Sequence, residues 1–426
     1  MMKAAFYTLG CKTNQFETQA LERLLSARGY TVVPFEQKAD VYIINTCSVT
    51  AIADKKSRNV IRRVRQLAPD SIIAVCGCSA EHTGEQMMRD CGADIILGTE
   101  EKSRLPDMIE QYVKERSYTI PEPIEFFDYM PAGGLVGRTR ALLKVQDGCR
   151  NFCAYCIIPY LRNKLLSLDL DIAVSEAARL EKEGYREIVI TGIEISSYGV
   201  DLPEKPSLLQ LLEGICTAAP NTRIRLGSLE PRTVTKEWAK RLSRYKNLCP
   251  HFHLSLQSGC DKTLKDMGRR YNTARYMEAA EYLRKYFPDC AITTDLIVGF
   301  PGETEEDFAQ TLEFLEKLRP AQVHIFPYSR REGTKAYSRP NQLTRAEKED
   351  RAARAAQLCS ALRKEYLDSF VGKELTVLFE QEKNGISEGY SMEYLPVAVK
   401  AREIHNCVCK VLITSAQKDK LSGEIK

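Results

Sequence analysis

The feature that most constrains this chain is a regular alternation of short apolar runs and stretches with helical periodicity, which extends from residue 3 to residue 340. Parallel strands need a crossover connection, usually a helix, so this alternation predicts parallel sheets in an α/β protein. The apolar runs are KAAFYTL, DVYIINT, SIIAVC and ADIIL, followed after residue 139 by ALLKVQ, REIVITG, TRIRLGS, HFHLSL, AITTDLIVGF and AQVHIFPYS.

A linker divides the alternation into two blocks. The stretch SYTIPEPIEFFDYMPAGGLVG contains three prolines and three glycines and has no helical period. The four runs before it predict a doubly wound parallel sheet in residues 1–136. The six runs after it predict an open, partial (β/α)6 barrel in residues 137–368, with its active site at the carboxyl ends of the strands. Helices are expected near 15–28, 51–68, 83–91, 102–116, 171–184, 207–218, 235–245, 272–286 and 303–318.

The last part of the chain has a different pattern. Residues 344–368 predict a long charged helix, and residues 369–426 alternate between apolar and polar residues at period two, with Gly and Asn breaks. A five-stranded, OB-like β-barrel fits a segment of this size.

The amino-acid composition limits the class of protein and the kind of chemistry that this chain can support. Of 426 residues, 44% are hydrophobic and 28% charged, which excludes a disordered chain. We expect no transmembrane helix, no secretory signal and a cytoplasmic location. Fifteen cysteines in such a chain favour metal or redox chemistry over disulfides. About half of them should be small buried hydrophobes, such as Cys91, Cys216, Cys249, Cys290 and Cys359.

Three cysteines follow the first strand of the predicted barrel. Cys149, Cys153 and Cys156 have the spacing C-x3-C-x2-C on one loop. Three thiolates this close can bind three irons of a cubane cluster and leave the fourth iron open to a small chelating molecule. A structural zinc site is the alternative, but it needs a fourth ligand, and no second C-x2-C pair follows nearby.

A second group of cysteines lies at the ends of the strands predicted in the first domain. Cys11, Cys47 and the pair Cys76 and Cys78 each occur where a strand ends. In a doubly wound sheet these strand ends meet at one crevice. We therefore predict that three cysteines distant in sequence can meet there and hold a second cluster.

The loop motif, with an aromatic residue directly before its last cysteine, resembles the radical S-adenosylmethionine superfamily. The resemblance implies that Cys149, Cys153 and Cys156 are the catalytic centre. They would hold a reducible 4Fe–4S cluster whose open iron chelates S-adenosylmethionine and cleaves it to a 5′-deoxyadenosyl radical.

Further residues are assigned to the cofactor by the same resemblance. The stretch DLIVGFPGE is similar to the superfamily's segment beside the adenine, which implies cofactor contacts from Gly299, Pro301, Gly302 and Glu303. Gln257 and Ser258 either place polar groups on the ribose or carboxylate of the cofactor or form an ordinary polar pair at a strand end.

The wider pattern resembles the methylthiotransferase family. The motifs GCxxNQ, NTC and GC-x-A precede the radical loop, and a small β-domain follows. The resemblance implies an auxiliary 4Fe–4S cluster on Cys11, Cys47 and Cys78, hence two clusters and S-adenosylmethionine as cofactors. Cys76 is an extra thiol. The family continues after its radical loop with Arg-Gly and further Arg, whereas this chain has LRNKLLSLDLD and keeps only Arg162 of that pattern.

The segments TGIEISSYGVD, RIRLGSLEP and CPHFHLSLQSGCDKTL resemble the branch that acts on N6-threonylcarbamoyladenosine 37 of tRNA, and the run Ser196–Gly199 carries much of this resemblance. The implied reaction replaces the hydrogen at C2 of the adenine by a methylthio group. The alternatives are isopentenyladenosine 37 of tRNA, a ribosomal-protein aspartate, a non-catalytic iron–sulfur RNA-binding protein and a structural zinc protein. Tyr198 either stacks on a base or packs the wall of the barrel, of which packing is favoured.

A tRNA substrate requires a basic surface. The net charge of +4 allows a polyanionic partner without requiring one. In the segment KKSRNVIRRVR, Lys55, Arg58, Arg62 and Arg65 share one predicted helix face, which is either a phosphate track or a solvated surface. Further cations that we expect on a basic rim are Lys262, Lys265, Arg269, Arg270, Arg330 and Arg331.

The last domain resembles the TRAM module, an RNA-binding β-barrel. The expected partners are therefore the tRNA anticodon stem-loop and an electron donor such as flavodoxin or ferredoxin. We expect neither a membrane nor a DNA partner.

Overall fold

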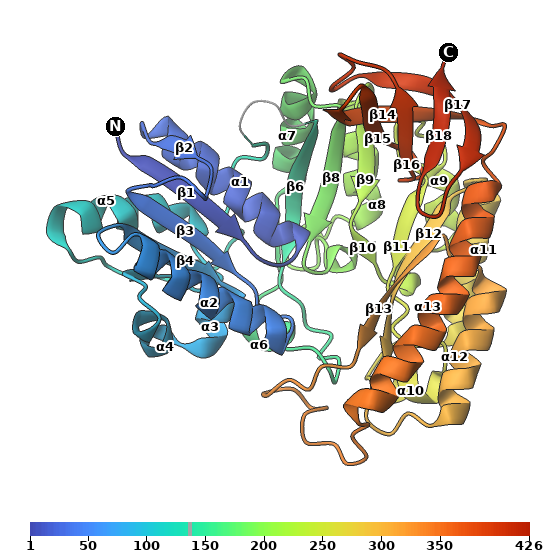
Figure 1. Cartoon of the computed structure of the whole chain (residues 1–426), viewed down its shortest axis with the longest axis horizontal. Helices are drawn as coiled ribbons and strands as arrows, with labels where there is room; N and C mark the ends of the chain where they lie inside the picture. Colours follow the sequence, from blue (N-terminus) through green and yellow to red (C-terminus); the bar gives the residue numbers. More distant parts are fainter. Residues whose placement is uncertain (135–138) are drawn as a thin grey trace.

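The computed structural model describes residues 1–134 and 139–426, and it begins with a five-stranded parallel sheet (Figure 1). This first domain consists of β1 (Lys3–Thr8), α1 (Lys12–Ala27), β2 (Thr31–Val33), β3 (Val41–Thr46), α2 (Ala51–Leu67), β4 (Ile72–Gly77), α3 (Cys78–Thr83), α4 (Glu85–Asp90), β5 (Ile95–Ile96), the 3-10 turn η1 (Lys102–Arg104) and α5 (Leu105–Glu115). Two features were not predicted: the edge strand β2, and the division of the helix expected at 83–91, which Gly84 interrupts with a φ of 84°.

Helices cover both faces of this sheet, as predicted for a doubly wound domain. α1 and α5 pack on one face, where Leu21 and Met108 join Val41 in one core. α2 and α4 pack on the other, where Ile61 and Met88 join a second core. The strand order β2-β1-β3-β4-β5 reverses between β1 and β3. In sheets of this order, ligands bind outside the carboxyl ends of the strands at that switch point.

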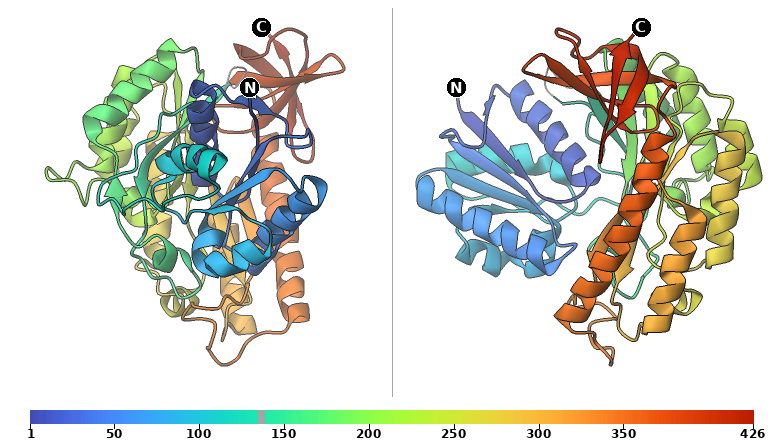
Figure 2. Two further views of the ribbon diagram at one scale, coloured as in Figure 1. Left: turned by 90° about the vertical axis from the view of Figure 1, so that its left-hand side faces the viewer. Right: turned by 45° about the vertical axis from the view of Figure 1, so that its right-hand side comes forward.

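The second block forms the predicted open barrel of parallel strands, to which the two-residue strand β7 adds an antiparallel edge (Figure 2). Its elements are β6 (Arg140–Asp147), α6 (Ile158–Leu161), β7 (Leu166–Ser167), α7 (Leu170–Lys182), β8 (Glu187–Gly192), η2 (Ile195–Ser197), α8 (Leu208–Ala218), β9 (Arg223–Leu226), β10 (Ser228–Leu229), η3 (Pro231–Thr233), α9 (Lys236–Leu242), β11 (His251–Leu254), α10 (Asp261–Asp266), α11 (Thr273–Tyr286), β12 (Ala291–Val298), α12 (Glu305–Leu318), β13 (Gln322–Pro327) and α13 (Arg345–Asp368).

The barrel is open because its strands form two ladders, β7-β6-β8-β9 and β10-β11-β12-β13. The expected strand TRIRLGS is divided at Gly227 into β9 and β10. β13 forms the free edge, and the long helix α13 lies along it (Figure 1). At the β6 side, α1 of the first domain contributes Phe16 and Ala20 to the barrel's own core, so the first two domains share packing.

The last 53 residues of the sequence hold a closed barrel with strand order β14-β15-β16-β18-β17, which confirms the predicted five-stranded fold. Its strands are β14 (Glu374–Lys383), β15 (Ile386–Ser391), β16 (Pro396–Lys400), β17 (Val408–Ala416) and β18 (Leu421–Ile425). The proposed boundary at 368/369 coincides with the end of α13. The other, at 136/137, lies outside the described residues. None of the helices in the described ranges combines the length and apolar composition that a membrane span needs.

The small C-terminal barrel packs against the amino ends of the strands of the large, open barrel. Glu187, the first residue of β8, is fully buried and forms ion pairs with Arg223 and Arg225. Arg223 also donates to the carbonyl of Tyr390 at 3.0 Å, and Arg225 to that of Met392 at 3.1 Å. One buried carboxylate is therefore shared by the two arginines that hold the third domain in place.

Candidate active site

A cavity of about 1020 Å³ lies where the three domains meet, and cysteines of both groups line it. Cys11 contributes from the first domain, and Cys149 and Cys156 from the loop after β6. The inner faces of β11, β12 and β13 form a further wall, and α13 and the small barrel close the far end. The structure thus brings to one chamber two cysteine groups that are far apart in sequence.

The first cysteine group lies at the switch point of the doubly wound sheet. Cys11 follows β1, Cys47 follows β3 and Cys78 begins α3 after β4. The chain passes so close that a Cβ added to Gly10 would lie 2.9 Å from the Sγ of Cys47. Asn14, which follows Cys11 in the same motif, donates to the carbonyls of Leu9 and Thr46 at 2.7 and 2.9 Å and joins the two loops.

Burial raises the pKa of Cys47 to about 11, and the neighbouring Cys78 and Cys11 raise it further. Burial also raises the pKa of Cys78. These thiols act electrostatically on one another, so a bound cation is required before all three become thiolates near neutral pH. Cys76 differs because it lies within β4, is fully buried and belongs to the apolar core.

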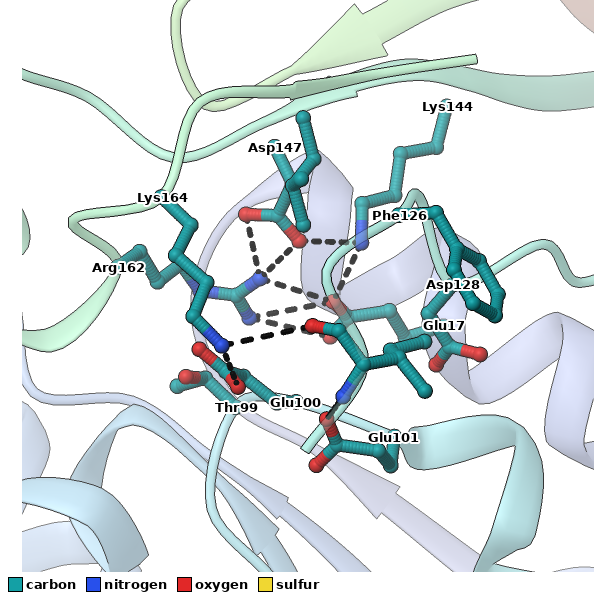
Figure 3. A pocket seen from close by; sticks show the side chains of 12 residues that line it. Glu17, Thr99, Glu100, Glu101, Phe126, Asp128, Lys144, Asp147, Arg162 and Lys164 are labelled. Atoms are coloured by element: carbon teal, nitrogen blue, oxygen red, sulfur yellow. Dashed lines mark hydrogen bonds and ion pairs between the residues drawn. The ribbon is translucent and has the colours of Figure 1, made fainter. Parts of the chain in front are cut away.

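A buried ionic network connects the first domain to the barrel beside these cysteines (Figure 3). Glu17 of α1 is inaccessible to solvent and forms ion pairs with Lys102, with Lys144 at 3.2 Å and with Arg162 at 3.1 Å. Arg162 also pairs with Asp147 at 2.7 Å. Burial alone would raise the pKa of Glu17, but Arg162, Lys102 and Lys144 hold that pKa well below its ordinary value.

Arg162 acts on both cysteine groups. The charge of its guanidinium opposes the burial that raises the pKa of Cys78, and its carbonyl accepts a hydrogen bond from the backbone N–H of Cys149 at 2.9 Å. The residue lies where the sequence departs from the methylthiotransferase pattern, so the one arginine kept there occupies the junction of the two sites.

The second cysteine group lies on a tightly folded loop. Gly148 has a φ of 79°, and a Cβ at this position would lie 1.7 Å from the carbonyl oxygen of Lys164, so only glycine fits. Cys153 accepts a hydrogen bond from Arg269 at 3.0 Å. Burial raises the pKa of Cys149 to about 11 and that of Cys156 to about 12.

Within the described part of the chain, no three His, Cys, Asp or Glu side chains converge on a point that could hold a single metal ion. A cubane cluster spreads its thiolate ligands over three different irons, so it needs wider spacing than one ion does. Such clusters fit both positions, because glycines allow the tight loops, the thiols of each group act electrostatically on one another, and the cavity adjoins both groups.

Two acidic residues beside the radical loop were not identified from the sequence. Glu194 follows β8 and Glu230 follows β10, and Asn151 of the loop donates to their carboxylates at 3.0 and 3.3 Å. Burial, followed by the charge of Glu230, raises the pKa of Glu194 to about 7. The sequence signal that could have identified them is an acidic residue one or two positions after each of two barrel strands, in TGIE and GSLEP.

The predicted cofactor residues lie outside the lining of the shared cavity. Gln257 has a φ of 69° and joins the β12 ladder through its backbone, and Ser258 is buried with its hydroxyl 3.3 Å from that of Thr311. The segment Gly299–Glu303 turns away toward a separate hollow, where Glu303 pairs with Arg351 at 2.5 Å. These contacts give each residue a structural role, and their cofactor roles stay predictions.

The residues of the predicted basic surface differ in whether they are exposed or paired. Lys55 and Arg62 are exposed on α2, whereas Arg58 pairs with Asp54 at 3.3 Å. Arg65 donates to the carbonyl of Gly92 at 2.8 Å and pairs with Asp94 at 2.5 Å. Two cations that we expected on the basic rim are instead buried. They are Arg269, which contacts Cys153, and Arg331, which pairs with Asp54 across the domain boundary.

Tyr198 packs in the wall of the barrel, the favoured alternative, and donates to the carbonyl of Leu168 at 2.8 Å. The cysteines expected in the core are also buried, namely Cys91, Cys216, Cys249, Cys290 and Cys359.

Two family models match the chain. The one described as Radical SAM superfamily matches residues 143–315, and the one described as Uncharacterized protein family UPF0004 matches residues 3–98. Among solved structures, the radical S-adenosylmethionine methyltransferase TsrM from Kitasatospora setae has a TM-score of 0.55 at 14% identity and covers 79% of this chain and 74% of its own. This likeness supports the fold.

Curated relatives match over most of the chain. The threonylcarbamoyladenosine tRNA methylthiotransferase MtaB of Bacillus subtilis is 38% identical over 95% of this chain and 91% of its own. The MtaB of Aquifex aeolicus is 37% identical over 91% and 95%. The tRNA-2-methylthio-N(6)-dimethylallyladenosine synthase of Oleidesulfovibrio alaskensis is 37% identical over 88% and 82%.

Proposed function

The chain belongs to the radical S-adenosylmethionine methylthiotransferase family, and from this premise we propose that it converts N6-threonylcarbamoyladenosine 37 of tRNA to its 2-methylthio derivative. The observation that carries the proposal is the single cavity lined by Cys11 and by Cys149 and Cys156. Sulfur transfer to a base and activation of that base must occur next to each other, and one shared chamber allows this.

The proposed cofactors are S-adenosylmethionine and two 4Fe–4S clusters, one held by Cys149, Cys153 and Cys156 and the other by Cys11, Cys47 and Cys78. When bound, they supply one-electron chemistry that activates an unreactive C–H bond, together with sulfur and a methyl group. The protein's part is to hold these groups in place and exclude water. Arg269 donates a hydrogen bond to the sulfur of Cys153 and so fixes its position, and Arg162 places a positive charge beside Cys78.

We assign Glu194 and Glu230 to the ammonium group of S-adenosylmethionine. They are the carboxylates that contact the radical loop through Asn151. Glu230 is already paired with Arg269 at 3.0 Å, whereas Glu194, with a pKa raised to about 7, is partly ionised near neutral pH, and a bound ammonium group would favour its charged form. Glu194→Gln removes this charge and keeps the shape. We expect it to weaken cofactor binding about 10-fold, the effect of one charge-assisted hydrogen bond. Isothermal titration with S-adenosylmethionine measures this, and Glu204→Gln in an exposed loop is the control. Equal affinity in both variants contradicts the assignment.

We propose that tRNA phosphates lie along the exposed part of α2. Val49, just before this helix, lines the cavity, so α2 begins at the rim of the chamber. Arg65 is fully engaged with backbone carbonyls and a carboxylate, which leaves Lys55 and Arg62 as the available cations of the predicted face.

We expect Lys55→Gln with Arg62→Gln to weaken tRNA binding and to reduce the slope of log K against log salt by about 1 for each lost phosphate contact. Filter binding at several salt concentrations measures this. Lys317→Gln on α12, an exposed lysine distant from the cavity, is the control. An unchanged slope would mean that Lys55 and Arg62 belong to an ordinary solvated surface and do not contact phosphates.

We propose further that the small barrel acts as a TRAM-like module that grips the anticodon stem, since it closes the far end of the cavity. A flavodoxin or ferredoxin would supply electrons. The proposed compartment is the cytoplasm, because tRNA is modified there.

The direct test uses purified, reconstituted protein with S-adenosylmethionine, a reductant and anticodon stem-loops that carry either N6-threonylcarbamoyladenosine or isopentenyladenosine. Mass spectrometry should find the 2-methylthio product from the first substrate, with 5′-deoxyadenosine as co-product. A product from the second substrate alone would assign the chain to the dimethylallyladenosine branch.

A further inference from the structure

The wall of the shared cavity away from the radical loop is polar, although the interior of a strand barrel is ordinarily packed with apolar side chains. β11 contributes His253, β12 contributes Asp295 and β13 contributes His324. The register places Asp295 opposite His324 and Thr293 opposite Gln322. An uncharged alkenyl substituent would offer this polar wall no hydrogen bonds, whereas a substituent rich in hydrogen-bonding atoms would add to those that it already forms.

Two cations enter this part of the cavity. Lys12, the first residue of α1, lines it and has no hydrogen bond or ion pair within the described ranges. Arg363 of α13 also lines it, with only 15% of its side chain exposed. Its guanidinium donates to the side-chain oxygen of Gln322 at 3.3 Å and to the carbonyls of Ala321 and Asp419 at 3.4 and 3.2 Å. The carboxylate of Asp419, 3.7 Å away, belongs to a side chain that is 73% exposed and is therefore weakly coupled.

His324 lines the same cavity and is affected by the charges of both cations. Burial lowers its pKa, Asp295 acts in the opposite direction, and the charges of Arg363 and Lys12 both add to the lowering. Asp295 is itself paired with His253 at 3.3 Å. Lys12 and Arg363 therefore add positive potential at this wall, which the carboxylate of Asp295 opposes.

A further polar atom in this wall lacks a partner. His251 is buried, lines the cavity, and its Nδ1 forms no hydrogen bond to any described residue. Its Nε2 lies 3.3 Å from the hydroxyl of Thr293. The wall thus combines an unpaired ammonium, a partly paired guanidinium and an unsatisfied imidazole nitrogen.

We propose that Lys12 and Arg363 flank a subsite for the carboxylate of an amino-acid-derived substituent on N6 of the target adenine. The proposal rests on the proposed function and names the feature by which the site selects its substrate. C2 and C6, the carbon that carries N6, belong to the same six-membered ring and are separated only by N1. A base that presents C2 near Cys11 therefore directs its N6 substituent to the adjoining wall, where Lys12 and His324 lie.

The test is equilibrium binding of three anticodon stem-loops to the reconstituted protein without reductant, so that no turnover occurs. The stem-loops carry N6-threonylcarbamoyladenosine, its neutral methyl ester, or isopentenyladenosine. The wild-type protein should bind the acid about 10- to 100-fold more tightly than the ester, the range for one or two charge-assisted hydrogen bonds.

Arg363→Gln should reduce the preference for the acid over the ester at least about 10-fold, and Arg363→Lys, which keeps the charge, should retain most of it. Lys12→Gln should act in the same direction, with iron and sulfide content measured because Cys11 is adjacent. Lys364→Gln is the matched control, since Lys364 follows Arg363 on the same helix but is exposed and pairs with Asp368.

Equal binding of acid and ester by the wild-type protein would overturn the subsite. So would an Arg363→Gln variant that folds, as judged by its thermal transition, and keeps the wild-type preference. These readouts need no catalysis. Failure of the proposed function would instead appear as absence of the methylthio product from a stem-loop that the wild-type protein binds well.

Discussion

Replacement of Cys149, Cys153 and Cys156 by alanine is expected to abolish the cleavage of S-adenosylmethionine and leave the cluster of the first domain in place. The three residues are the cysteines of one loop, and two of them, Cys149 and Cys156, line the cavity. The reconstituted variant should hold about half of the wild-type iron and sulfide, because each cubane has the same composition. It should form no 5′-deoxyadenosine above background.

The complementary variant replaces Cys11, Cys47 and Cys78. We expect this protein to cleave S-adenosylmethionine and to make no methylthio product, because its radical loop is intact and its sulfur-carrying site is lost. Cys407→Ala, an exposed cysteine outside both groups, should retain both clusters and full activity. Quantification of iron, sulfide, 5′-deoxyadenosine and methylthio product separates the variants. Product formation by either triple variant would contradict the two-site assignment.

Glu17→Gln is expected to be strongly destabilising. It leaves Lys102, Lys144 and Arg162 buried beside a neutral amide, with only Asp147 as a remaining anion. Removing one partner from a buried ionic cluster typically costs about 3–5 kcal/mol. Because the chain has several domains, we expect an early unfolding transition of the first domain in calorimetry, with loss of the iron bound there. Glu85→Gln, in an exposed pair with Arg89, should leave the transition unchanged.

The same network predicts a pH dependence. The pKa of Glu17 is lowered in the folded protein, so the folded state binds fewer protons at this site than the unfolded state does. Its contribution to stability is therefore fully present above the unfolded pKa, about 4.3, and is lost as the pH falls below that value. Calorimetry between pH 6 and pH 2 should show this loss below about pH 4.3 in the wild-type protein and a smaller one in Glu17→Gln. Parallel curves for the two proteins would contradict the role of Glu17.

The sequence was most informative where local pattern and topology coincide. The alternation of apolar and helical segments sufficed to predict the parallel sheets of both domains. The cysteines at the strand ends could be placed in one crevice, because the carboxyl ends of parallel strands lie along the same edge of a sheet. The approach of that crevice to the radical loop could not be predicted. It depends on Glu17 meeting Lys102, Lys144 and Arg162, residues 85, 127 and 145 positions away in the sequence.

Basic residues were the least predictable. A periodic spacing places Lys55 and Arg65 on one helix face, but tertiary contacts turn Arg65 toward Gly92 and Asp94 and leave Lys55 exposed. Arg331 resembles a surface cation in sequence and is buried because Asp54 and Ser48 of another domain receive it. The position of a charged residue in the sequence does not show which residue will pair with it, since ion pairs form between segments that are distant in sequence.

The central claim is tested most directly by mass spectrometry of tRNA nucleosides from cells with the gene, cells without it, and cells that carry only the Cys149→Ala form. The account predicts that 2-methylthio-N6-threonylcarbamoyladenosine is lost without the gene, that its unthiolated precursor accumulates, and that the wild-type gene alone restores the product. An unchanged nucleoside profile in cells without the gene would contradict it.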